Sequence, residues 1–410
     1  MENSVLKNKL NTKKFIIKNR FFKAAMSETL ATKDNNPTQA LVNLYSRWAQ
    51  GGAGLLMSGN VMVDRDALGE PGNVVIEDER NLTMLIKWAK AGTQNDTHFW
   101  IQLNHPGKQS PKTVSKNPVA PSAIPLSENV KDFFNEPRAL TTEEIWDIIK
   151  RFGNAAKIAK KAGFTGVQIH AAHGYLINQF LSPHHNQRID EWGGDLNNRM
   201  KFLLKIYDEI RKQVGEDFPV GLKLNSADFQ RGGFTEEESM MVLKKMDEVG
   251  IDLIEISGGN YENPKMFEGN VRESTKQREA YFLDYAQKAR SLVNAPLVVT
   301  GGFRSEKGMV EAIESGAVDM VGIGKAFALN PDLPNQIFNG TYKTVNIKPI
   351  KTGIKNLDKK ISSMLEIAWY EQQFARMSKG KNPNPNHNIW ITILKTILNH
   401  GLEIFQKRRA

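Results

Sequence analysis

The stretch TTEEIWDIIKRFGNAAKIAKKAGFTGVQIH, residues 141–170, joins a helical pattern to a short strand-like run. Thr141 followed by Glu144 is typical of the capping box that begins a helix, and Gly163 is typical of a residue that ends one. GVQIH then has the length and the β-branched residues of a buried strand. The stretch therefore predicts a helix followed by a strand.

This unit recurs along the chain. Further helices are predicted over 197–215, 235–250, 281–293 and 305–315. Strand-sized runs, most of them continuously apolar, lie at 22–26, 54–59, 98–103, 166–170, 220–224, 252–257, 296–302 and 319–324. Eight such strands alternating with helices predict the α/β class and a (β/α)8 TIM barrel with a helical C-terminal extension.

Two segments fall outside the repeat. Residues 104–140 hold six prolines and few periodic apolar residues, which predicts a long loop near the active site. Residues 341–410 contain two helical patterns separated by NPNPNHN, and we expect them to pack on the barrel or on a partner subunit. The barrel itself would occupy residues 1–340, and a homo-oligomer is compatible with this tail.

Composition narrows the function. The 410 residues include no stretch apolar enough to span a membrane, and MENSVLKNKLNTKKF lacks an apolar signal core, so we expect a cytoplasmic protein without membrane contact. Because there is no cysteine, disulfides, thiol nucleophiles and iron–sulfur ligation are excluded, and redox chemistry would need a bound cofactor. The net charge of +10 is spread along the chain, which favours a basic enzyme over a nucleic-acid-binding protein.

Glycines end the last two predicted strands. TGGFR (300–304) and GIGKA (322–326) each lead into a helical segment and add a cation, Arg304 or Lys325. Loops after strands seven and eight form the usual phosphate site of such barrels. A P-loop is excluded by Asp319 and Ala326, and a Rossmann fingerprint by Phe327.

Three proton-carrying side chains follow the fourth predicted strand: His170, His173 and Tyr175. A metal site with His184 or His185 is disfavoured because no carboxylate stands at ligand spacing in the first pair. Two neutral imidazoles can instead donate hydrogen bonds to a carbonyl or phenolate oxygen, and a tyrosine can deliver a proton to the neighbouring carbon.

Several blocks together resemble the old yellow enzyme family of FMN-dependent NAD(P)H:flavin oxidoreductases, from about residue 5 to 340. They are NRFFKAAMSE (19–28), WIQLNHPGKQ (100–109), HAAHGYLINQFLSPHHNQRIDEWGGDLNNR (170–199), GLKLNSADF (221–229), SGGNYE (257–262), VVTGGFRS (298–305) and VGIGKAFALNPDL (321–333). The block 170–199 is highly specific by itself.

The resemblance implies a set of site residues. Flavin contacts would come from Ala24, Ala25, Met26, Ser27, Gly59, Gln102 and Lys223, and phosphate contacts from Gly301, Gly302, Gly324 and Lys325. Lys223 would stabilise the anionic reduced flavin. His170 and His173 would hold the carbonyl oxygen of an α,β-unsaturated substrate, and Tyr175 would protonate it after hydride transfer. NADH or NADPH would be the electron donor, and no metal is expected.

The sequence departs from the commonest family pattern at a few positions. Lys223 and Lys325 stand where arginine is frequent, Trp192 replaces a tyrosine, and Ser27 replaces a cysteine or threonine that tunes the flavin in some relatives. Without cysteine, and with about 70 residues after the barrel, we expect no iron–sulfur cluster, which argues against the 2-enoate reductase and trimethylamine dehydrogenase branches.

Two alternatives remain at this point. A flavin-free barrel lyase or isomerase acting on a phosphorylated substrate would explain the glycines but not Gln102 or the His–His–Tyr set. A basic nucleic-acid-binding protein rests on net charge alone. The oxidising substrate, the choice of NADH or NADPH and the oligomeric state stay open.

Overall fold

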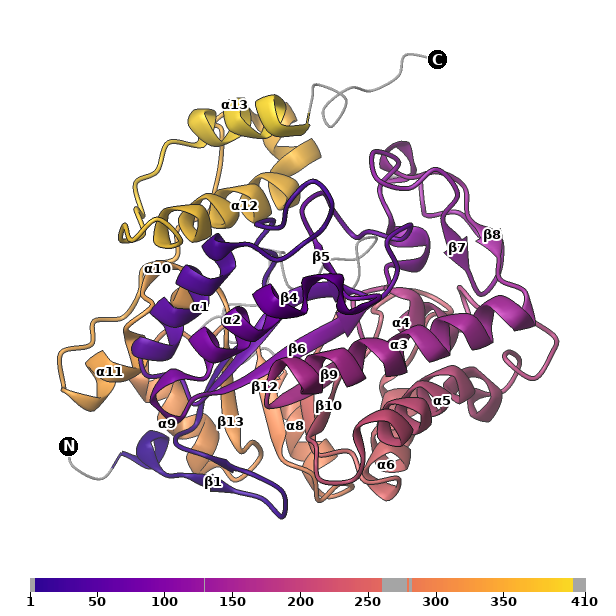
Figure 1. Cartoon of the computed structure of the whole chain (residues 1–410), viewed down its shortest axis with the longest axis horizontal. Coiled ribbons are helices and arrows are strands. Elements are labelled where there is room, and N and C mark those ends of the chain that lie inside the picture. The colour runs from indigo at the N-terminus through magenta and orange to yellow at the C-terminus, as the bar shows by residue number, and fades with distance from the viewer. Residues whose placement is uncertain (1–3, 129, 260–278, 280–281, 401–410) are drawn as a thin grey trace.

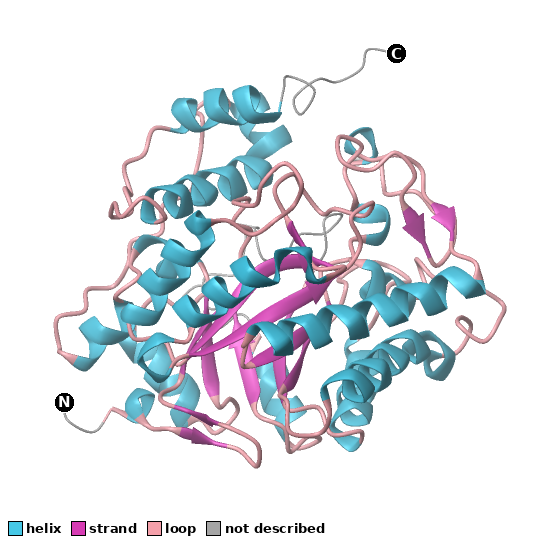
Figure 2. Ribbon diagram, in the orientation of Figure 1, coloured by secondary structure: helices cyan, strands magenta, loops and turns pink. Residues whose placement is uncertain are grey.

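Eight parallel strands form a closed barrel. They lie at the centre of the molecule, with helices around them (Figure 2). The computed structural model describes residues 4–128, 130–259, 279 and 282–400. The barrel strands are β3 (Phe21–Lys23), β4 (Leu55–Met62), β6 (His98–Asn104), β9 (Gly166–Ala171), β10 (Val220–Asn225), β11 (Leu253–Ser257), β12 (Leu297–Thr300) and β13 (Met320–Ile323). The predicted (β/α)8 barrel is confirmed, with strand ends shifted by a few residues.

The first and last strands close the ring. β3 pairs in parallel with β13 through Phe21 and Val321, and with β4 through Phe22 and Leu55. Every other neighbouring pair is also parallel, so all eight carboxyl ends open at the same face of the barrel. Chemistry in such barrels collects at this face.

Helices surround the strands (Figure 1). Those flanking the barrel are α1 (Gln39–Gln50), α2 (Leu82–Gly92), α3 (Thr142–Ala162), α4 (Leu176–Leu181), α5 (Leu196–Val214), α6 (Glu236–Glu248), α8 (Leu283–Arg290), α9 (Glu306–Glu314), α10 (Lys325–Leu329) and α11 (Leu333–Phe338). The Thr141–Glu144 capping box is present, and Gly163 ends α3 with φ of 91°, a left-handed conformation that suits glycine.

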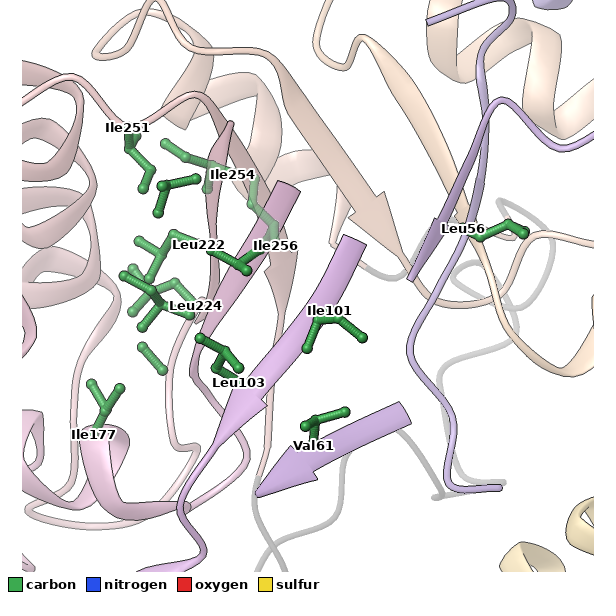
Figure 3. Packing of buried hydrophobic residues seen from close by; sticks show 14 of the residues in the cluster. Leu56, Val61, Ile101, Leu103, Ile177, Leu222, Leu224, Ile251, Ile254 and Ile256 are labelled. Carbon is green, nitrogen blue, oxygen red and sulfur yellow. The ribbon is translucent and has the colours of Figure 1, made fainter. Parts of the chain in front are cut away.

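The hydrophobic core lies on both sides of the strands. Outside the barrel, Leu222, Leu224, Ile254 and Ile256 pack toward the surrounding helices (Figure 3). A separate cluster inside is centred on Trp100, which is fully buried with Phe15, Phe22, Met57, Leu253, Val298 and Met320. A Cβ at Gly166 would stand 2.5 Å from the Trp100 ring, so the indole requires glycine on the neighbouring strand.

The amino-terminal end of the barrel is covered by a hairpin of β1 (Leu10–Asn11) and β2 (Ile16–Ile17). Leu10, Phe15 and Ile17 belong to the same cluster as Trp100. The opposite, carboxyl end is therefore the face that remains available for a ligand. In its described part, the 104–140 segment forms two short paired strands, β7 (Val119–Ala120) and β8 (Arg138–Ala139), and two 3-10 helices, at Gly107–Gln109 and Lys131–Phe133.

The carboxyl-terminal tail forms α12 (Lys355–Met377) and α13 (Ile389–His400), and α12 packs beside α1 and α10 (Figure 1). The ring of Phe374 meets that of Trp48 edge-on at 5.4 Å, and Asn43 donates a hydrogen bond to the Ser378 carbonyl oxygen at 2.9 Å. The last ten residues of the predicted tail lie outside the described residues. In the part of the chain that the structure describes, no helix has the length and apolar character to cross a bilayer.

Replacing Phe374 by Ala should destabilise the protein by about 3–5 kcal/mol, the usual cost of truncating a fully buried phenylalanine. The side chain is 0% exposed, so its removal leaves a cavity between α12 and α1. Met241→Ala, at a position 55% exposed on α6, is the control and should change stability little. Denaturant unfolding measures both, and equal stability of the two variants would contradict the packing described for α12.

Candidate active site

A cavity of about 360 Å³ opens at the carboxyl ends of the strands. Its lining includes Ala24, Ala25, Met26, Ser27, His173, Tyr175, Lys223, Gly301, Gly302, Gly324 and Lys325. The structure thus brings together most of the residues proposed from the sequence. Gly59, Gln102 and His170 are not among the residues that line the cavity.

One end of the cavity is built from backbone. Gly301 and Gly302 have φ of 135° and 89°, so glycine is required for this turn after β12. A Cβ at Gly322 would stand 2.0 Å from the Thr300 hydroxyl, which explains the glycine on β13. Gly324 precedes α10 and also lines the cavity. Such uncovered backbone admits a bulky anionic group.

The three cations named from the sequence form ion pairs with carboxylates. Lys325 lies 2.7 Å from Glu366 of α12, and Lys223 lies 3.0 Å from Glu255 of β11. The second pair is almost completely buried. A third cation, Arg304, pairs with Glu279 at 3.1 Å and also lines the cavity.

The two histidines and the tyrosine are in mutual contact. The His170 ring meets those of His173 and Tyr175 edge-on, at 5.1 and 4.9 Å. Nδ1 of His170 accepts a hydrogen bond from the Ala172 N–H at 3.2 Å, which places the proton of a neutral imidazole on Nε2. Burial, the other histidine and Lys223 lower the pKa of His170 well below its usual value, so the ring is neutral at pH 7.

His173 is held by its backbone in an uncommon conformation. Its φ is 62°, in the left-handed region, and its N–H donates to Oδ1 of Asn225 at 3.1 Å. The Gly174 N–H donates to Oδ1 of Asn178 at 2.7 Å. Both amides in turn donate to the buried carboxylate of Asp228, at 3.3 and 3.1 Å. This buried network fixes the loop that carries the imidazole and the phenol.

The ring of His173 is also anchored. Nε2 lies 2.8 Å from the Ser257 hydroxyl, and burial, followed by the charge of Lys223, lowers the pKa of His173 well below its usual value. Asn60 donates to the Tyr175 hydroxyl oxygen at 3.4 Å. A phenol hydroxyl can accept one hydrogen bond and donate another. The arrangement offers neutral donors, suited to an oxygen that gains negative charge.

Gly59, predicted as a flavin contact, is hydrogen-bonded to a carboxylate. Its N–H donates to Oε1 of Glu28 at 2.7 Å, and a Cβ would stand 2.0 Å from the same carboxylate. Tyr45 also donates to Glu28, while Lys23 donates to the Met57 carbonyl oxygen at 3.0 Å. Burial raises the pKa of Glu28 and lowers that of Lys23 to about 8. Gly59 therefore contacts the buried carboxyl group of Glu28.

His185, one of the two histidines considered for a metal site, contacts a lysine instead. Nδ1 of His185 lies 2.9 Å from Nζ of Lys108, which also donates to the Ile124 carbonyl oxygen at 3.0 Å. The lysine ties the 104–140 segment to the loop after α4. Among the described residues, no group of three or more histidine, aspartate or glutamate side chains is placed to hold a metal ion.

Sequence reasoning missed part of the lining: Asn60, Glu70, Gly258, Gly259, Thr300, Ile347, Glu366, Ile367 and Tyr370. Thr300 is the last residue of β12 and Asn60 lies near the carboxyl end of β4, where the side chains of such barrels reach the active site. Ile347, Glu366, Ile367 and Tyr370 belong to the tail, and no motif in the sequence links them to the barrel.

Comparisons with known proteins agree with this geometry. The model of the NADH:flavin oxidoreductase / NADH oxidase family matches residues 8–344. The NADH-dependent flavin oxidoreductase iliE of Hypocrea jecorina is 39% identical over 351 residues, covering 79% of this chain and 86% of the relative. The NADH oxidase of Thermoanaerobacter brockii is 32% identical, covering 80% of this chain and 50% of the relative.

Solved structures show the same fold. The old yellow enzyme homologue from Zymomonas mobilis superposes with a TM-score of 0.71 at 26% identity, covering 83% of this chain and 94% of that one. A 2-naphthoyl-CoA reductase superposes with a TM-score of 0.77 at 27% identity over 82% of this chain, which spans 52% of that protein. The chain belongs to the NADH:flavin oxidoreductase / NADH oxidase family and is an old yellow enzyme-like oxidoreductase.

Proposed function

We propose that the cavity binds FMN and that the enzyme uses NADH or NADPH to reduce an electrophilic acceptor such as an α,β-unsaturated carbonyl compound. One observation carries the proposal. A single cavity is lined by Gly301, Gly302, Gly324 and Lys325, by His173 and Tyr175, and by Lys223. A flavin-free lyase or isomerase would use the glycines and Lys325 but has no need of His173 and Tyr175.

The residues present fit this cofactor. Gly301, Gly302, Gly324 and Lys325 would hold the phosphate. The Ser27 hydroxyl and Oδ1 of Asn60 are buried, and neither has a hydrogen-bond partner among the described residues, as expected where a polar ring system supplies the missing partners. Lys223 would place a positive charge near the pyrimidine ring. A phosphate bound there would share the Lys325 ammonium with Glu366.

Bound FMN would supply hydride transfer, first from the nicotinamide and then to the acceptor. The chain's own residues would act on the acceptor. Nε2–H of His170, together with the His173 ring, would hold its carbonyl oxygen and stabilise the negative charge that develops there. The Tyr175 hydroxyl would give its proton to the α-carbon. The tail residues Ile367 and Tyr370 would help to shape the acceptor pocket.

Anaerobic titration of the purified enzyme tests this proposal. Addition of NADH or NADPH should bleach the flavin absorption, and addition of cyclohexenone should restore it. Reoxidation by oxygen but not by the enone would support reduction of the flavin by the nicotinamide but would reject α,β-unsaturated carbonyl compounds as acceptors. A flavin that neither nicotinamide reduces would reject the proposed electron donor.

Glu70 should make flavin binding depend on pH near neutrality. It lines the cavity, and burial raises the pKa of its carboxyl to about 7. Below pH 7 the carboxyl is protonated, and above pH 7 its charge repels an anionic ligand. We expect the ratio of two dissociation constants for FMN, that of the wild-type apo-enzyme divided by that of apo-Glu70→Gln, to rise about threefold to tenfold from pH 6 to pH 8. The expected size follows because two charges in one cavity interact by about 1 kcal/mol.

The ratio removes the titration of FMN itself, because both proteins bind the same ligand. Glu314→Gln, at an exposed position on α9, is the control and should give a ratio that does not vary with pH. A constant ratio for Glu70→Gln as well would show that Glu70 does not titrate in contact with the ligand site.

A further inference from the structure

A row of polar side chains crosses the inside of the barrel. It begins at Gln102 on β6, whose Nε2 donates to Oε1 of Gln168 on β9 at 2.6 Å. Nε2 of Gln168 donates to Oε2 of Glu255 on β11 at 2.9 Å. The other oxygen of Glu255 lies 3.0 Å from Nζ of Lys223 on β10. All four side chains are 0–3% exposed.

Glu255 determines the direction of every hydrogen bond in this row. An ionised carboxylate can only accept, so the atom of Gln168 that faces it must be the amide nitrogen. The amide oxygen of Gln168 then faces Gln102 and requires a donor there. Gln102 must present its own nitrogen to Gln168, which leaves Oε1 as an acceptor.

That remaining acceptor matches the flavin. The pyrimidine ring carries one N–H donor, N3–H, flanked by two carbonyl oxygens, so a glutamine whose free atom is an oxygen can accept from N3–H. A reversed Gln102 would present its amide nitrogen to the same donor. The charge of Glu255 thus determines, through the side chain of Gln168, which atom Gln102 offers to the cofactor.

The same carboxylate also offsets the charge of Lys223. In addition to the lysine, Oε1 of Glu255 accepts a hydrogen bond from the Thr300 hydroxyl at 2.7 Å. Lys223 and Thr300 both line the cavity, whereas Glu255 is 0% exposed and lies behind them. A buried carboxylate beside the lysine weakens the positive potential that the lysine projects into the cavity.

We propose that Glu255 is a positioning residue that fixes the orientation of Gln102 and limits the electrostatic effect of Lys223 on the flavin. It acts through these two side chains. The inference rests on the proposed binding of FMN. It predicts two separable effects, one on cofactor affinity through Gln168 and one on the flavin potential through Lys223.

Glu255→Gln tests the electrostatic effect. The substitution keeps the shape of the side chain and removes its charge, so Lys223 should favour the anionic reduced flavin more strongly. We expect the preference for reduced over oxidised FMN to increase about tenfold, which corresponds to a midpoint potential about 30 mV higher for a two-electron couple. Equilibration with a reference dye under xanthine oxidase reduction measures the potential, and Glu255→Asp should return it toward the wild-type value.

Gln168→Met tests the orientation effect without any change of charge. It breaks the row between Gln102 and Glu255, so the dissociation constant of FMN for the apo-enzyme, measured by fluorescence quenching, should rise about tenfold. The potential should stay close to that of the wild type. This variant also keeps the proposal testable if Glu255→Gln does not fold, which circular dichroism would show.

The outcomes separate this inference from the proposed function. An unchanged potential in folded, FMN-loaded Glu255→Gln, or an unchanged FMN affinity in Gln168→Met, would overturn the role of Glu255 while leaving the flavoenzyme intact. A wild-type protein that binds no FMN would overturn the proposed function itself.

Discussion

Replacing Tyr175 by Phe should slow the reduction of cyclohexenone by about 10²–10⁴-fold, the usual contribution of a positioned general acid. The substitution removes only the hydroxyl group, and the ring can keep its edge-on contact with His170 at 4.9 Å. Reduction of the flavin by the nicotinamide needs no proton from this residue, so its rate should stay close to that of the wild type. Stopped-flow absorption under anaerobic conditions measures the two half-reactions separately.

Tyr285→Phe is the matched control. Tyr285 is a buried tyrosine on α8 whose hydroxyl lies 2.7 Å from that of Ser239, and it is not among the residues that line the cavity. Its loss should change neither half-reaction. If Tyr175→Phe slows both half-reactions equally, the hydroxyl supports cofactor binding or folding, and its role as proton donor is rejected.

The double substitution of His170 by Ala and His173 by Gly should weaken the binding of phenols by about tenfold to hundredfold, because each lost hydrogen bond contributes about 1 kcal/mol. The double substitution should also slow the reduction of enones, since removing one donor to a developing oxyanion lowers kcat by about 10²–10³-fold. Glycine is chosen at position 173 because φ is 62° there, a conformation that alanine disfavours. Spectral titration of the oxidised enzyme with a phenol measures the affinity.

His98 provides the control for this pair. It begins β6 at the opposite end of the barrel, where Nε2 lies 3.0 Å from the Ile16 carbonyl oxygen. His98→Ala should leave phenol binding unchanged. Phenol-induced spectral shifts that persist unaltered in the double variant would remove both histidines from the acceptor site.

Much of the fold could be predicted because its signals are local. Thr141, Glu144 and Gly163 mark the ends of one helix by capping alone, and the strand at 166–171 is recognisable because burial on both faces requires short apolar and β-branched runs. The glycines at 301 and 302 were informative for a related reason. Their positive φ angles exclude other residues, so a backbone requirement is visible in the sequence.

Contacts between distant segments could not be predicted in this way. Lys325 was assigned to a phosphate from its place in GIGKA, but nothing local indicates that Glu366, 41 residues later, pairs with it. Gly59 lies within β4, and nothing local indicates that its N–H donates to Glu28, 31 residues earlier. Glu255 lies within an apolar strand, and its importance becomes visible only when the barrel closes and places it beside Gln168 and Lys223.

The proposed chemistry depends on FMN bound in the cavity at the carboxyl ends of the strands. The most direct test is to purify the protein, record its absorption spectrum, release the cofactor by denaturation and identify it by chromatography. We predict flavin absorption bands and one FMN per chain. A colourless protein that takes up no added FMN would contradict FMN binding and favour a flavin-free barrel enzyme, and release of a different cofactor would also contradict FMN binding.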